Sequence, residues 1–425
     1  MIERSPADET EIVWIEKLSD RAQNKNKQVE ITARRERTIL IRVIDRKRVG
    51  SHRTGIAEPG ELDSAVRAAI AQSRSRETLP GLLHFSADDS PLRTGEDRLW
   101  DQEIANLRSR KVEAMFDPWL RRRGTIRLDW AKAQVAVFNS RGIRRQTAVT
   151  AANIEARVSR APGTGRAAGA SRFLNLLEPR AVVERARSLH ASDEVAGLPA
   201  LPITIVLSPE ATSELIDILN RVAFSAISYY SGSSFLREHL DVQVFDRSIN
   251  LRDDAADPRG LSFPFDLEGA PKRPIHLILK GSPKTPALDQ RQAAQLGLAP
   301  TAHAIGGNDA RAMNLFLDTG EVSDSELIRS VNNGLWIGWL DHVECFEPSR
   351  VQVRARASSV RRIESGKLSS AIPDLIWEDS LLRAFSNLVG IGSSQVQRIS
   401  QDGFLGGIST PSMAFSGVSQ LRLDS

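Results

Sequence analysis

The clearest pattern of apolar and polar residues lies in the middle of the chain. Ile203–Leu207 is a short β-branched apolar run, typical of a strand buried on both faces. Ser208, Pro209 and Glu210 follow at once, and these residue types favour the first turn of a helix. Apolar residues then recur at helical spacing: Leu215, Ile216, Leu219, Val222 and Ala223. The pattern predicts a strand, a turn and a helix that begin a second domain.

The first half of the chain mixes helical and strand periodicities. Residues 7–22 place Ile12, Ile15 and Leu18 at helical spacing and predict a helix. Further helices are expected at residues 62–70, 100–119 and 180–191. Alternating apolar residues predict antiparallel strands at 29–33, 39–43 and 49–54, and a meander over 125–158. Because there is no strict βαβ rhythm, residues 1–198 are predicted to form an N-terminal mixed α+β domain.

The second half carries many more strand patterns than helix patterns. Strands are expected at 240–244, 275–279, 335–340 and 351–355, with a hairpin over 360–368. The hairpin turn falls at residues 364–367, where Gly366 supplies the positive φ that tight turns need. In the last third of the chain, only residues 381–388 predict a short helix. The overall fold class is therefore α+β, and residues 199–425 form a β-rich C-terminal domain with a curled or barrel-like antiparallel sheet.

Composition and charge narrow the class of protein. The 425 residues are 41% hydrophobic and 26% charged, which is ordinary for a globular protein with a sizeable core. The 57 basic and 53 acidic residues nearly cancel, so nucleic-acid binding is not expected. The single cysteine, Cys345, excludes an intramolecular disulfide and suits a reducing compartment. The first residues lack an apolar signal segment, and no apolar run approaches the ~20 residues of a membrane span. We therefore expect a cytoplasmic protein.

Several stretches carry a family resemblance. They are FNSRGIRRQ (138–146), VLSPEATSELIDIL (206–219), GSSFL (232–236), VFDRSINLRDD (244–254), DPRGLSFPFDLEGAPKRPI (257–275), GGNDARAMNLFLDTGEVSDSELIRSVNNGLWI (306–337), IESGKL (363–368) and GISTPSMAFSGVSQL (407–421). Together they resemble the TldD/PmbA family. Its members are paired bacterial proteins that process or degrade peptides.

The resemblance also indicates what this chain lacks. In the catalytic TldD-type subunit the mid-chain helix carries HExxxH, whose histidines bind zinc and whose glutamate acts as the base. Here the corresponding positions, after Glu214, hold about Asp217, Ile218 and Val222. The subunit's zinc-binding cysteine near the C-terminus has no counterpart in residues 395–402. The chain thus resembles the metal-free TldE (PmbA) subunit, and we assign it no catalytic, cofactor-binding or metal-binding residue and no cofactor.

The residues by themselves offer no other catalytic constellation. The histidines are scattered: His52, His84, His190, His239, His276, His303 and His342. His342, Glu344 and Cys345 are the one compact cluster, but on a strand Cys345 points away from the other two, which is poor for chelation.

Three other features favour a structural interpretation over a functional one. The GxGxxxG run at 163–169 is predicted to be a flexible loop rather than a phosphate loop. The arginines at 121–123 are expected to end a helix. Acids in the long loop 253–274 are expected to face Arg252, Arg259 and Lys272 rather than a cation.

Three functions stay open at this point. The leading hypothesis is a non-catalytic peptidase subunit that pairs with a TldD-like zinc metallopeptidase chain and helps to enclose its peptide-binding cavity. The second is an enzyme that works without the family's metal. The third is a binding protein for an extended peptide or for a regulatory partner such as DNA gyrase. The expected partners are the TldD-like subunit, a second copy when the chain is alone, and unfolded peptide.

Overall fold

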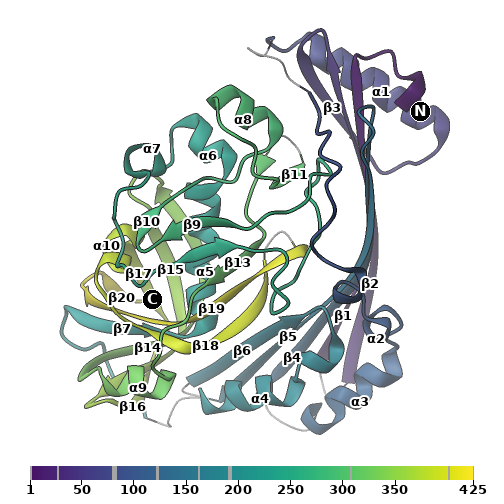
Figure 1. The fold of residues 1–425 in the computed structure, drawn as a ribbon. Coiled ribbons are helices and arrows are strands. Elements are labelled where there is room, and N and C mark those ends of the chain that lie inside the picture. The colour runs from purple at the N-terminus through teal and green to yellow at the C-terminus, as the bar shows by residue number, and fades with distance from the viewer. Residues whose placement is uncertain are drawn as a thin grey trace.

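The computed structural model describes residues 2–25, 28–78, 84–120, 124–160, 163–189, 194–306, 309–400 and 403–424. The described chain builds one six-stranded sheet, one twelve-stranded sheet and a two-stranded ribbon. Figure 1 shows the long strands of the first sheet curving around one side of the second half of the chain. The α+β fold class is therefore confirmed.

The first sheet is antiparallel throughout, in the order β3-β2-β1-β4-β5-β6. Its strands are β1 (Glu9–Lys25), β2 (Gln28–Asp45), β3 (Arg48–Thr54), β4 (Thr125–Asn139), β5 (Arg144–Arg160) and β6 (Gly163–Ser171). Four helices cover its outer face: α1 (Pro59–Arg74), α2 (Gln102–Ala105), α3 (Ser109–Leu120) and α4 (Pro179–Ser188). Short 3-10 turns lie at Ile2–Arg4, Glu96–Arg98 and Leu174–Leu176.

The helix predicted at residues 7–22 was wrong, because this segment is strand β1. Both faces of the strand are covered, which hides the two-residue period. Val13 packs inward with Phe263, whereas Ile12 and Trp14 pack outward against the cluster that includes α1. The resulting spacing of apolar residues resembles that of a helix.

Two further expectations for the first half need correction. The helix predicted over 100–119 is two helices, α2 and α3. The GxGxxxG run is strand β6, paired along its length with β5, and not a loop. Strand β6 packs directly against α4. A Cβ atom added to Gly169 would lie 3.4 Å from Val182 Cγ2 of that helix. The arginine run at 121–123 lies outside the described residues.

The second sheet is mixed and open, in the order β10-β9-β8-β13-β19-β7-β14-β15-β17-β20, with β16 on β15 and β18 on β19. Its strands are β7 (Ile203–Leu207), β8 (Leu251–Asp253), β9 (Ile275–Leu279), β10 (Ser282–Pro283), β13 (Asn314–Leu317), β14 (Asn333–Glu347), β15 (Gln352–Glu364), β16 (Lys367–Ile372), β17 (Leu375–Ser380), β18 (Leu388–Ser400), β19 (Gly403–Val418) and β20 (Leu421–Leu423). Most neighbours are antiparallel, but β7 pairs in parallel with β14 and β13 with β19. The sheet is curled, as expected, and it does not close into a barrel.

Most of the expected elements of the second half are present, and one is wrong. Strands β9, β14, β15 and β16 and the short helix α10 (Leu381–Ser386) match the sequence patterns. Residues 240–244, expected as a strand, instead follow helix α7 (Leu236–His239) as turns and bends. The expectation of a single helix in the last third is also wrong, because α8 (Gln290–Leu296) and α9 (Asp324–Arg329) lie there. The remaining elements are α6 (Ala226–Ser231), β11 (Ala304–Gly306) and β12 (Asp309–Ala310).

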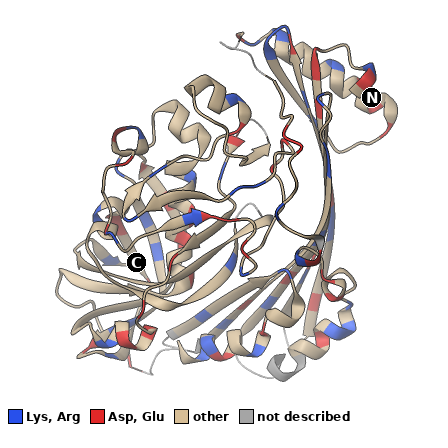
Figure 2. Cartoon of the chain, viewed as in Figure 1, with Lys and Arg blue, Asp and Glu red and all other residues tan. Residues whose placement is uncertain are grey.

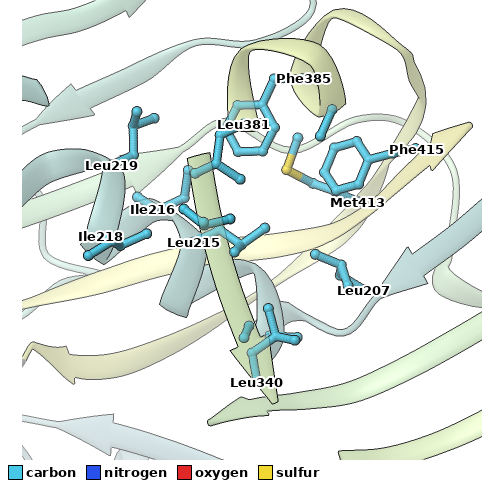
Figure 3. Close-up of a cluster of buried hydrophobic side chains, with 14 of the residues drawn as sticks. Leu207, Leu215, Ile216, Ile218, Leu219, Leu340, Leu381, Phe385, Met413 and Phe415 are labelled. Atoms are coloured by element: carbon cyan, nitrogen blue, oxygen red, sulfur yellow. The ribbon is translucent and has the colours of Figure 1, made fainter. Parts of the chain in front are cut away.

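Helix α5 (Pro209–Leu219) lies in the core of the second half. Ser208 caps it by accepting a hydrogen bond from the Ala211 amide, as the sequence predicts. Ten of its eleven residues are buried, so protein surrounds it on all sides. Figure 3 shows Leu215 and Ile216 directed towards Phe385 and Phe415, within the largest apolar cluster. A π-helical turn, Asn220–Phe224, continues the chain.

The two halves meet through the long loop 253–274. Phe263, Phe265 and Leu267 pack against inner-face residues of the first sheet, including Val13 and Leu40. The proposed domain boundary after residue 198 lies between the last strand of the first sheet and the first strand of the second. In the described ranges, no helix has the length and apolar character to cross a membrane.

Candidate functional site

The polar residues of α5 lie where the resemblance places the zinc motif of the catalytic subunit. Glu210, Ser213, Glu214 and Asp217 lie three or four residues apart and so share one side of the helix. All except Glu214, which is partly exposed, are buried. A row of carboxylates inside a protein requires compensating positive charge.

Each of these carboxylates contacts an arginine, and the three arginines belong to three different elements. Arg185 of α4 donates from Nη2 to Glu210 Oε1 at 2.8 Å. Arg221 Nε, one turn further along, lies 3.2 Å from Asp217 Oδ2. Arg398 of β18 donates from Nη1 to Glu214 Oε1 at 2.6 Å. Guanidinium groups therefore neutralise the negative charges of the carboxylates on α5.

Arg398 makes the most contacts of the three. Its Nη1 also lies 2.9 Å from Ser213 Oγ and 3.1 Å from the Glu210 carbonyl oxygen. Its guanidinium stacks over the Trp339 ring, 4.3 Å from the centroid. Arg398 belongs to the stretch 395–402, where the resemblance places the zinc-binding cysteine of the catalytic subunit. This stretch delivers a fixed positive charge to α5 instead of a metal ligand.

These residues do not fit a zinc ion. Zinc sites in proteins use three or four nitrogen, sulfur or carboxylate ligands. Val222 is apolar, and Glu214 and Asp217 already contact arginines. Within the described parts of the chain, no group of three or more His, Cys, Asp or Glu side chains is placed to hold a metal ion. The expectation of a zinc-free chain stays a prediction that metal analysis must test.

The cluster of His342, Glu344 and Cys345 is arranged as the strand pattern predicted. His342 and Glu344 are exposed on β14, whereas Cys345 is half-buried and packs against the main core. Burial raises the pKa of the Cys345 thiol, which makes it a poor nucleophile at neutral pH. His190 lies outside the described residues.

The expectation for the acids of the loop 253–274 is met by Arg252 and Arg259, whereas the buried Lys272 Nζ has no hydrogen-bond partner among the described residues. Asp257 accepts hydrogen bonds from Arg252 Nη2 at 2.7 Å and from Arg259 Nε at 2.9 Å. Asp253 and Lys272 are both buried. Burial by itself would raise the pKa of Asp253, but Lys272 and His303 lower it below the ordinary aspartate value.

A second buried charge cluster joins the first sheet to the long loop 253–274. Arg42 of β2 donates from Nε to Glu11 Oε1 at 2.8 Å and from Nη1 to Glu268 Oε1 at 2.8 Å. Nearby, burial and the Glu268 charge raise the pKa of Asp266 and of Asp289 to about 7. The cluster stabilises the contact between the halves and has no access to solvent, because Arg42, Glu11 and Glu268 are at most 4% exposed.

A chain of ion pairs runs from α5 towards the first sheet. Arg166 of β6 stacks on Trp339, 3.7 Å from the ring centroid, so the ring contacts both Arg166 and Arg398. Arg166 also donates to Asp341 Oδ1 and to Glu155 Oε1, each at 2.7 Å. These contacts hold β6 against β14 and β18.

The ion pairs continue across the inner face of the first sheet. Arg127 Nη2 lies 2.9 Å from Glu155 Oε2, and Arg127 Nε lies 2.9 Å from Asp129 Oδ2. Arg21 Nε lies 2.5 Å from Asp129 Oδ1. Arg21, Arg127 and Asp129 border a cavity of about 620 Å³, which lies between this face and Ile399 of β18. The site thus combines a helix neutralised by arginines with a polar hollow beside it.

The sequence analysis missed Arg185, Arg398 and Trp339. Arg398 is 184 residues from Glu214, and no local spacing links the two. The one usable signal was indirect: buried acids on a helix predict basic partners, although not which ones.

Sequence comparisons match part of the chain to known proteins. A family model described as the PmbA/TldA metallopeptidase C-terminal domain matches residues 202–420, which is 219 of 425 residues. A Methanothermobacter thermautotrophicus protein described as a metalloprotease is 26% identical over 205 residues. That match spans 46% of this chain and only 44% of the relative's length.

Solved structures share the fold over nearly the whole chain. A candidate modulator of a DNA gyrase from Thermotoga maritima has a TM-score of 0.82 at 20% identity, covering 97% of this chain and 96% of its own. TldE from Thermococcus kodakarensis has a TM-score of 0.82 at 18% identity with the same coverage. A candidate modulator of DNA gyrase from Bacteroides thetaiotaomicron has a TM-score of 0.78 at 16% identity, covering 100% of this chain and 96% of its own.

At these identities the structural likeness shows the fold alone. The family model, in contrast, covers more than half of the sequence. The chain therefore belongs to the TldD/PmbA family of metallopeptidase-like proteins.

Proposed function

We propose that this chain is the non-catalytic, TldE-like subunit of a peptide-processing metallopeptidase. Its partner is a TldD-like chain that carries the zinc and the base. In this assembly the chain described here supplies part of the wall around the substrate and none of the bond-breaking groups.

The observation that carries the proposal is the contact of Arg398 with Glu214. A zinc peptidase uses its metal to activate water, and a carboxylate base completes the step. On this helix Glu214 already accepts a charge-assisted hydrogen bond from Arg398. Asp217 is paired with Arg221. Each of these carboxylates is held by its guanidinium partner and is therefore not placed to take a proton from a catalytic water.

The fold that the chain shares with the solved structures favours an accessory role over an unrelated one. The arginines keep α5 in place without a metal, so the surrounding sheet and the cavity keep their shape. Retaining this shape is useful to a subunit that must fit against a partner and enclose a peptide.

The proposal also covers assembly and location. We expect the chain to form a homodimer when it is made alone, because a paired subunit has an interface that it otherwise exposes. We place the pair in the cytoplasm, which suits the single cysteine.

Mixing experiments test the pairing directly. The purified chain is combined with a relative that bears HExxxH, and the mixture is analysed by size-exclusion chromatography with light scattering. We expect one complex that contains both chains in equal amounts. Separate elution of the two chains with every HExxxH-bearing relative from the same genome would contradict the subunit role.

A further inference from the structure

We propose that the cavity on the inner face of the first sheet binds an extended, acidic peptide segment through side chains rather than through backbone pairing. The inference rests on the proposed function, and it assigns a substrate class and a location to the peptide. We call this cavity the inner-sheet cavity. It lies against strands β1, β2, β4 and β5 and is closed on one side by Ile399.

The hollow exists because small residues lie side by side across three strands. Ser19 of β1 pairs with Ala131 of β4, and Ala131 pairs with Ala151 of β5. Residues at directly paired positions point to the same face of a sheet. Short side chains in one row leave space where longer ones would fill it. At about 620 Å³ the cavity is in the range that holds a ligand.

Basic residues border the cavity in excess over acidic ones. The strand register places Lys17, Arg21, Arg34 and Arg127 on this face, with the acids Glu36 and Asp129. These are four cations against two anions, and Glu155 beside the cavity also pairs with Arg127, which leaves a surplus of one positive charge. Asp20 also borders the cavity, but it alternates to the outer face of β1, towards Lys132. Figure 2 shows the two signs of charge interspersed along these strands.

The existing ion pairs leave part of this positive charge available. Arg34 contacts Glu36 at 2.8 Å, yet its side chain is 75% exposed. Arg21 contacts Asp129 at 2.5 Å and is 57% exposed. A guanidinium has five donors, so one contact to a protein carboxylate leaves others for a ligand. Arginine binds a second carboxylate with favourable planar geometry.

The backbone on this face of the sheet cannot serve the ligand. Strands β1, β4 and β5 each have a neighbour on both sides, so their amides and carbonyls are used in the ladder. Strand β3 pairs with β2 only over residues 39–45, so among the described strands the outer edge of β2 at residues 32–36 has no neighbour. A peptide that lies on the face, rather than along that edge, cannot be added as another strand. Recognition then depends on side chains, and the charge surplus selects an acidic segment.

Peptide binding to the full chain tests the inference. The probes are three fluorescein-labelled unstructured octapeptides with the same Gly/Ser frame, carrying four Glu, four Gln or four Lys residues. Fluorescence anisotropy at low ionic strength measures each affinity. We expect the Glu peptide to bind at least tenfold more tightly than the Lys peptide, and added salt to weaken it. Equal binding of the Glu and Lys peptides would overturn the proposal.

Two neighbouring arginines provide a matched control. Arg34 faces the cavity, whereas Arg35 lies on the opposite face of β2 and contacts Glu16. Both are exposed, at 75% and 65%, so Arg34→Gln and Arg35→Gln remove the same charge with little effect on folding. We expect R34Q to weaken the Glu peptide roughly threefold to fivefold and R35Q to leave it unchanged. Equal losses would show general attraction to a basic protein and overturn the site.

A substitution that keeps the charge tests the shape. Ala131→Leu fills the floor of the cavity, and we expect it to weaken the Glu peptide as well. Unchanged binding by A131L would place the peptide elsewhere. These measurements use the chain without its partner, so their failure leaves the pairing result intact. Failure of pairing in the mixing experiment likewise leaves the binding result intact.

Discussion

Arg398 of strand β18 lies 2.6 Å from Glu214 of helix α5, with its Nη1 donating to Glu214 Oε1. The contact joins two segments that are 184 residues apart. Both segments correspond, by resemblance, to places where catalytic relatives hold zinc ligands. In this chain a guanidinium and a carboxylate at these two places neutralise each other's charge.

Replacing Arg398 with methionine tests the strength of this contact. The variant leaves Glu214 without its cation and removes hydrogen bonds to Ser213 and to the Glu210 carbonyl. We expect the free energy of unfolding to fall by about 2 kcal/mol, as for other charge-assisted hydrogen bonds in partly buried sites. Urea denaturation followed by tryptophan fluorescence measures it.

The control variant is Arg422→Met. Arg422 pairs with Glu378 at 3.1 Å, but its side chain is 61% exposed. We expect a loss below about 1 kcal/mol, because water screens exposed ion pairs. Equal losses for R398M and R422M would mean that the contact to Glu214 does not stabilise α5.

The buried acids near Glu268 predict a pH dependence of stability. Burial, followed by the Glu268 charge, raises the pKa of Asp289 from 3.8 to about 7. At pH values between 3.8 and about 7, Asp289 keeps its proton in the folded chain and releases it in the unfolded chain. Stability from this group is therefore present below about pH 4 and is lost as the pH rises towards 7. His303, whose pKa burial lowers, changes stability in the opposite direction up to its ordinary value of 6.5.

The variant Asp289→Asn isolates the acid from the histidine. Asn keeps the cap that Asp289 provides to α8, where its side chain accepts from the Gln292 amide. We expect the stability of wild type relative to D289N to fall by about 1–2 kcal/mol between pH 5 and pH 8. Urea unfolding across this range gives the two curves. Parallel curves would contradict the buried-acid explanation.

Metal analysis tests the absence of a zinc site. A zinc ion at α5 would have to displace Arg398 and Arg221 and would find no histidine. We expect elemental analysis after mild dialysis to give well below one zinc per chain. The HExxxH-bearing partner, purified in the same way, is the positive control. A reproducible ratio of one zinc to one chain would overturn the TldE-like assignment.

Sedimentation at micromolar concentration tests the expected homodimer. The chain has a mass of 46.8 kDa, so a dimer sediments as a species of twice that mass. We expect this species when the chain is purified alone. A monomer at all concentrations would indicate that the partner is required for any association.

The sequence patterns predicted the strand–turn–helix at residues 203–219 because every local signal there agrees. A buried strand, a serine cap, a proline in the first turn and helical spacing all fall in the expected order. Strand β1 was mistaken for a helix because packing on both faces removed its alternation. Strand β6 was mistaken for a loop because its glycines and alanines give no apolar alternation, whereas its pairing with β5 is a tertiary property.

The candidate site was only half predictable. The missing histidines and cysteine could be seen in the sequence, since absence at given positions needs no structure. Arg185 and Arg398 could not be found, because each reaches α5 from an element distant in sequence. The inner-sheet cavity was equally hidden, because it depends on the register that aligns Ser19, Ala131 and Ala151.

The variant Asp217→Ala tests the absence of chemistry on α5. We assign no catalytic role to Asp217, so the activity of this chain together with its TldD-like partner should stay within a few-fold of wild type. Loss of the Arg221 contact would show only in stability. A drop of a hundredfold or more in kcat, with the complex still formed, would place Asp217 in the catalytic machinery.

A peptide-cleavage assay tests the proposed non-catalytic subunit role most directly. It uses three samples: this chain alone, the TldD-like partner alone, and both together. Hydrolysis of an unfolded peptide is followed by mass spectrometry with and without a zinc chelator. We predict no turnover by this chain alone. We also predict zinc-dependent turnover that is highest when both chains are present. Turnover by this chain alone that persists in the chelator would contradict it.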